Sequence, residues 1–145
     1  MKNEWINVRI NKIALAMYVP PNTGKIVHRN RPFHGFIFNS ETVSRDYCFS
    51  DGTVLKTKGN DLFYLPKGST YVVKDRASGG CYAINFDADI SDTPFSVNLK
   101  NCDIIKKLFK RAAEEWDGLG VKQSAFAMSA LYEAICALHK ESERS

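Results

Sequence analysis

The sequence predicts an all-β core followed by two α-helices. From Val8 to about Leu99, runs of aromatic and β-branched residues alternate with turn residues at roughly eight-to-twelve-residue spacing. This spacing is typical of an antiparallel sandwich or barrel. After Asn101 the apolar residues change to the spacing of one helix face.

Short strands are expected throughout the first part of the chain. They cover residues 25–29, 33–38, 47–49, 53–56, 62–65, 70–73 and 81–86. Asp51-Gly52 and Gly79-Gly80 lie between expected strands and supply the positive φ that tight hairpins need. Short strands joined by tight turns favour antiparallel pairing.

The two expected helices occupy residues 101–141. Apolar residues at helical spacing run from Ile104 to Trp116, and Gly118 or Gly120 can end this helix. A second helix follows from about Lys122, with an apolar stripe in which small and large residues alternate. Together they predict an antiparallel helical hairpin. The stripes can serve as intramolecular core or as a dimer interface, and the sequence leaves both possibilities open.

Composition limits the class of protein. The 145 residues suffice for one domain, and 44% hydrophobic with 25% charged residues is the balance of an ordinary globular protein. The longest apolar run, Ile13 to Val19, is far shorter than the roughly 18 residues that a membrane-spanning helix needs. Since no export signal is recognisable, we expect a cytoplasmic protein.

The basic residues are not gathered into a nucleic-acid-binding patch. The net charge is +4, and no stretch packs five or six basic residues together. Direct DNA binding by these residues is therefore not expected.

The four cysteines are widely separated and lack zinc-site spacing, which favours reduced, buried thiols.

One motif resembles a known family. Gly59, Pro66, Gly68 and Tyr71 follow the order of the second cupin motif, in which two glycines and a proline precede a metal-binding histidine. Tyr71 stands at the histidine position. Counting back to the first cupin motif places Arg29 and Arg31 at its His-x-His pair, and Gly35 or Phe36 at its acidic position.

These replacements bear on the chemistry. Cupin metal sites use neutral imidazoles and a carboxylate, whereas a guanidinium has no available lone pair and repels a dication. We therefore expect no metal, no other cofactor and no enzymatic activity. The alternative is a metal-dependent cupin oxygenase or isomerase acting on a small metabolite.

Further residues resemble the N-terminal effector-binding domain of bacterial AraC-type transcription regulators. They are the run Arg29–Phe38, Asp51-Gly52, Lys58–Tyr71, Tyr82–Phe86, Trp116 and Leu131-Tyr132. The resemblance implies a cupin-like jelly-roll barrel over residues 1–100 and a helical hairpin for packing or dimerisation over residues 101–141. It also implies a helix-turn-helix DNA-binding domain that these 145 residues do not include.

The implied function is sensing of a small polar effector, with sugars as one class, by a homodimer that forms through the C-terminal helices. A carbohydrate-binding module and a dimerisation module without a pocket are alternative functions. Effector binding is expected to change how residues 1–24 or the helix pair pack.

Candidate effector contacts follow from the resemblance and from strand alternation. Cys81, Ala83 and Asn85 share one face of their strand and face the expected pocket, while Tyr82, Ile84 and Phe86 face the helices. The predicted ligand-binding residues are Arg29, Arg31, His34, Phe36, Tyr47, Tyr71 and Asn85. Purely structural roles are open as well: surface charges for the two arginines, a packed or hydrogen-bonded side chain for His34, and core packing for Tyr47.

Overall fold

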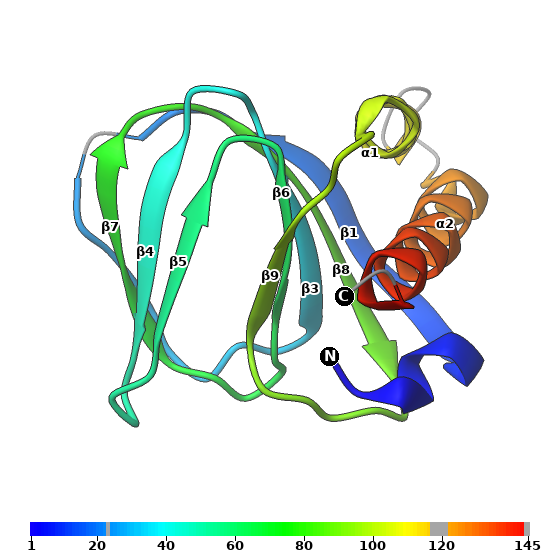
Figure 1. Ribbon diagram of the computed structural model, residues 1–145, viewed down its shortest axis with the longest axis horizontal. Helices are drawn as coiled ribbons and strands as arrows, with labels where there is room; N and C mark the ends of the chain where they lie inside the picture. Colours follow the sequence, from blue (N-terminus) through cyan, green and yellow to red (C-terminus); the bar gives the residue numbers. More distant parts are fainter. Residues whose placement is uncertain (23, 117–121, 144–145) are drawn as a thin grey trace.

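The computed structural model describes residues 1–22, 24–116 and 122–143, and it has three layers (Figure 1). A four-stranded sheet faces a five-stranded sheet, and the C-terminal helices cover the outer face of the five-stranded sheet. The chain begins with a 3-10 helix, η1 (Asn3–Asn7). The helices are α1 (Asp103–Trp116) and α2 (Ser124–Glu143). The strands are β1 (Ile10–Val19), β2 (Ile26–His28), β3 (His34–Asn39), β4 (Ser44–Phe49), β5 (Val54–Lys58), β6 (Asp61–Leu65), β7 (Tyr71–Ala77), β8 (Cys81–Ala88) and β9 (Phe95–Asn98).

All strand pairs are antiparallel. The five-stranded sheet has the order β1-β8-β3-β6-β9, and the four-stranded sheet has the order β2-β7-β4-β5. The expected antiparallel β core is confirmed, but the described strands form two sheets that do not close into a barrel, so the cupin-like jelly-roll barrel stays a prediction. β1 and β2 are edge strands that follow each other in the chain. Pro20 and Pro21 come directly after β1 and have no N–H group with which to continue a ladder.

The seven expected strands correspond to β2 through β8, but β1 and β9 were not individually expected. β1 was missed because its burial does not alternate. Two register shifts, after Ile10 and after Ile13, leave Ile10, Ile13 and Ala16 buried at intervals of three residues. An interval of three hides the period of two that identifies a strand.

An aromatic core lies between the five-stranded sheet and the helices. Trp5 of η1 is fully buried there, with its ring 5.3 Å from that of Phe36 and 5.0 Å from that of Tyr64 in edge-on contacts. The indole Nε1 donates a hydrogen bond of 2.9 Å to Oδ2 of Asp92. η1 also packs against α2, so the N-terminal segment belongs to the same core as the helices.

Most of the apolar stripe of each helix is buried within the chain, although Ile104 at the start of the first stripe is exposed. The buried residues are Ile105, Phe109, Ala112 and Trp116 of α1, and Ala127, Ala130, Leu131, Ala134, Ile135 and Leu138 of α2. α1 packs on β1 and β8, and the two helices pack on each other. The second helix begins at Ser124 rather than near Lys122, while Gly118 and Gly120 lie outside the described residues. No helix in the described ranges has the length and apolar character required to cross a membrane.

Replacing Trp5 tests whether the N-terminal segment is part of the core. We expect Trp5→Ala to lower the free energy of unfolding by about 3–5 kcal/mol, because it leaves a cavity among four aromatic rings. Urea denaturation followed by far-UV circular dichroism measures this change. The neighbouring Ile6→Ala is the control, since Ile6 is 42% exposed and its loss should change stability by about 0.5 kcal/mol or less. Equal effects of the two substitutions would contradict the assignment.

Candidate ligand-binding cavity

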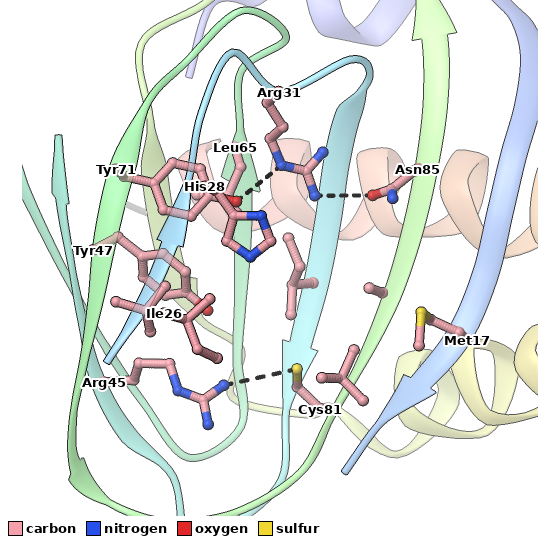
Figure 2. A pocket seen from close by; sticks show the side chains of 14 residues that line it. Met17, Ile26, His28, Arg31, Arg45, Tyr47, Leu65, Tyr71, Cys81 and Asn85 are labelled. Atoms are coloured by element: carbon pink, nitrogen blue, oxygen red, sulfur yellow. Dashed lines mark hydrogen bonds between the residues drawn. The ribbon is translucent and has the colours of Figure 1, made fainter. Parts of the chain in front are cut away.

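A cavity of about 310 Å³ lies between the two sheets. Its wall is mostly apolar, formed by Val19, Ile26, Ile37, Leu65, Val73 and Ala83. Met17 of β1 and His28 of β2 also line it, and both are exposed. The cavity therefore opens to solvent between these two edge strands, and Figure 2 shows its interior with Met17 and His28 on opposite sides.

At one end of the cavity, neutral groups from three segments of the chain hold Arg31, and Figure 2 shows two of them, on Tyr71 and Asn85. Its Nε donates to the Tyr71 hydroxyl at 3.1 Å, and its Nη2 donates to Oδ1 of Asn85 at 2.9 Å. Nη1 donates to the backbone carbonyl of Phe33 at 2.7 Å. Each of the three guanidinium nitrogens thus donates a hydrogen bond to the protein, and these bonds fix the orientation of the group.

The turn after β6 holds the backbone of Arg31. The Arg31 N–H donates to the Ser69 carbonyl at 2.9 Å, and the Gly68 N–H donates to the Arg31 carbonyl at 2.7 Å. Gly68 has a φ of 84°, a conformation that favours glycine. The turn is closed by the Ser69 side chain, which donates to the Pro66 carbonyl at 2.6 Å. The Pro-x-Gly motif therefore places Arg31 and leads directly into Tyr71 on β7.

Gly35 provides the space in which the Arg31 guanidinium lies. A Cβ atom at Gly35 would be 2.7 Å from Nη2 and 2.9 Å from Cζ of Arg31. These separations are shorter than van der Waals contact, so any side chain at this position would displace the guanidinium.

At the other end, Arg45 is neutralised. It forms a salt bridge with Asp75, donates from Nη2 to the Gly79 carbonyl at 3.1 Å, and lies with Nη1 3.9 Å from Sγ of Cys81. Burial raises the pKa of the Cys81 thiol, although Arg45 opposes this effect, so the thiol is neutral at pH 7. At this end of the cavity, other groups of the protein therefore compensate the charge of Arg45.

Two phenols line the cavity between these ends. Burial raises the pKa of both Tyr47 and Tyr71, so both keep their protons at neutral pH. Arg31 partly opposes the rise at Tyr71. Because the Tyr71 oxygen accepts a bond from Arg31, its own proton can be donated to a ligand.

The structure brings four of the seven predicted ligand-binding residues to this cavity, namely Arg31, Tyr47, Tyr71 and Asn85. Strand alternation predicted the facing of Cys81, Ala83 and Asn85 correctly, since all three line it. Arg29 is exposed and is not part of the lining.

His34 and Phe36 are buried on the opposite face of β3, in the core beneath the helices. Their rings lie 5.7 Å from that of Phe86. Gly35 and Ile37 occupy the cavity face of β3 instead. Nδ1 of His34 accepts the backbone N–H of Lys67 at 3.2 Å and lies 2.8 Å from the Tyr64 hydroxyl, so its contacts here are with the protein.

Two of the lining residues that were not predicted, His28 and Arg45, carry polar side chains, and the others are Met17, Val19, Ile26, Ile37 and Leu65. Arg45 lies two residues before Tyr47, so the alternation that turns Tyr47 inward also predicts Arg45. His28 faces the cavity because β2 pairs with β7 opposite Tyr71. Only the tertiary pairing reveals that position.

No protein-family model matches the chain, and no curated protein matches it either. Within residues 1–22, 24–116 and 122–143, no group of three or more His, Cys, Asp or Glu side chains is arranged to hold a metal ion.

The buried His34 gives the stability of the fold a predictable pH dependence. Burial lowers its pKa below the ordinary 6.5, the positive charges of Lys67 and Arg31 add to this, and Asp87 opposes it. Below pH 6.5 the unfolded chain therefore binds more protons at His34 than the folded chain, and the free energy of unfolding falls as the pH decreases.

NMR titration of the histidine ring protons, with His34→Gln to assign the signal, measures this pKa directly. Urea denaturation between pH 8 and pH 5 should show a smaller loss of stability in His34→Gln than in the parent chain. A His34 pKa at or above 6.5 would contradict the prediction.

Proposed function

We propose that this chain is the ligand-sensing domain of an AraC-type transcription regulator and that it binds a small polar effector between its two sheets. The observation that carries the proposal is the fixed Arg31 guanidinium in an otherwise mostly apolar cavity. A mostly apolar pocket with a few convergent polar groups is the usual form of a small-molecule site.

The strand pairing supports a cupin-like jelly roll, opened along β1 and β2, as the architecture of the sensor. β4 pairs with β5, β3 with β6, β2 with β7 and β1 with β8, as expected when one long antiparallel hairpin is rolled into two sheets. The segment from Pro66 to Tyr71 keeps the spacing of the second cupin motif. Six residues separate Gly59 from Pro66, one more than in that motif. The support for a cupin-like fold therefore comes from the segment Pro66 to Tyr71 and not from Gly59.

A route from the cavity to the helices supports a sensing role. Asn85 on β8 bonds Arg31, while its neighbours Ile84 and Phe86 face the core beneath the helices. α1 packs on β8 and on its partner β1. An effector that shifts Asn85 would therefore move residues in contact with the helix layer. In the proposed homodimer the exposed surface of this layer, which includes Ile104, contacts the second copy.

A cavity-filling variant tests effector binding without knowledge of the effector. Thermal-shift screening with sugars and small organic acids should identify compounds that raise the melting temperature, since a ligand at a hundred times its Kd contributes about 2.7 kcal/mol. Ala83→Phe places a ring in the cavity from β8 and should abolish these shifts while the circular dichroism spectrum is unchanged. Shifts of equal size in both proteins would place binding elsewhere, and no shift in the parent chain counts against a sensor.

The regulator assignment has a separate test in the coding sequence. We expect the same reading frame to continue beyond residue 145 into two helix-turn-helix patterns. A stop codon directly after residue 145 in the genome would contradict a fused DNA-binding domain and leave only the ligand-binding proposal.

A further inference from the structure

We propose that the effector is a small monocarboxylate with an apolar body, and that its carboxylate binds Arg31. This inference rests on the proposed function, since it names the chemical class that the cavity binds. It follows from the charges, the hydrogen-bonding groups and the wall of the cavity.

Arg31 is a cation without a protein counter-ion in the described part of the chain. No Asp or Glu lines the cavity, and no carboxylate oxygen of the described residues lies within 4.0 Å of the Arg31 guanidinium. Arg45 differs, because Asp75 neutralises it. A half-buried, unpaired positive charge is unfavourable until an anion is brought to it.

The guanidinium retains donors for such an anion. Three of its five N–H groups have acceptors in the described residues: the Tyr71 hydroxyl, Asn85 Oδ1 and the Phe33 carbonyl. One N–H group remains on each terminal nitrogen. Two donors on one guanidinium suit the two oxygens of a carboxylate, and the proton of the Tyr71 hydroxyl adds a third donor.

A neutral sugar matches these groups less well. Each sugar hydroxyl donates as well as accepts, so a sugar needs several acceptors around it. At the Arg31 end, the oxygens of Asn85 and Tyr71 already accept bonds from Arg31. A carboxylate accepts only, and it therefore fits a site whose unused groups are donors.

The rest of the cavity sets the body of the ligand. Val19, Ile26, Ile37, Leu65 and Val73 form an apolar wall beyond Arg31, and burying alkyl or aryl groups against it contributes about 0.8 kcal/mol for each CH₂. The volume of about 310 Å³ is at the small end of ligand pockets. Short alkyl, branched or phenyl carboxylates meet both conditions.

The test compares acids with their uncharged analogues. Hexanoate, isovalerate and phenylacetate are titrated calorimetrically into the chain at pH 7, each alongside its primary amide. We expect at least one acid to bind, and its amide to bind roughly tenfold to a hundredfold more weakly, as the loss of charge-assisted hydrogen bonds implies.

Matched variants assign the binding to Arg31. Arg31→Met should weaken the acid by a similar factor, whereas Arg29→Met removes an equal charge two residues away, outside the cavity, and should leave the affinity unchanged. Gly35→Ala displaces the guanidinium without removing its charge and should also weaken the acid. Circular dichroism and melting temperatures verify that each variant is folded, so one of Arg31→Met and Gly35→Ala remains informative if the other does not fold.

The outcomes separate this inference from the proposed function. Equal affinity for acid and amide, unchanged binding in both Arg31→Met and Gly35→Ala, or binding of sugars with no acid bound would overturn the carboxylate assignment and leave the sensor intact. Absence of binding by every acid, amide and sugar would overturn both.

Discussion

The five-stranded sheet is covered on both faces, and the rest of the structure depends on this double burial. Every residue of β3 and β6 is buried, because one face meets the helices and the other meets the second sheet. The outer face carries the aromatic core around Trp5 and most of the apolar burial. Since that core stabilises the five-stranded sheet, the inner face of the sheet can border the cavity without loss of the fold.

Two arginines among the described residues line the cavity, and their charges are compensated differently. Arg45 joins β4 to Asp75 of β7 and to the Gly79 carbonyl before β8, and its charge is neutralised in doing so. Among the described residues, the acceptors that Arg31 contacts are all neutral. One end of the cavity is therefore closed by a completed ion pair, and the other presents a net positive charge. This difference is the basis for the proposal that a carboxylate binds at the Arg31 end.

Several segments of the chain together determine the position of Arg31. The turn from Pro66 to Ser69 holds its backbone, Gly35 leaves space for the guanidinium, and Tyr71 and Asn85 fix its orientation. Each condition comes from a different element, so the site forms only when both sheets are in place. Such preorganisation reduces the entropy lost when a ligand binds.

The sequence by itself determined the local features of this protein. It predicted seven of the nine described strands, the inward face of β8, the two amphipathic helices and the turn that leads into Tyr71, because these depend on period and turn chemistry. For β3, only the tertiary structure decided which layer each face meets. The sequence did not place His34 and Phe36 beneath the helices, because β3 is buried on both sides and hydrophobicity cannot distinguish two buried faces. The pairing of Arg45 with Asp75 and the burial of the helix stripes within one chain were likewise decided by contacts between distant segments. Periodicity fixes the relative facing of neighbouring residues, whereas the contents of the space beyond each face depend on how the whole chain packs.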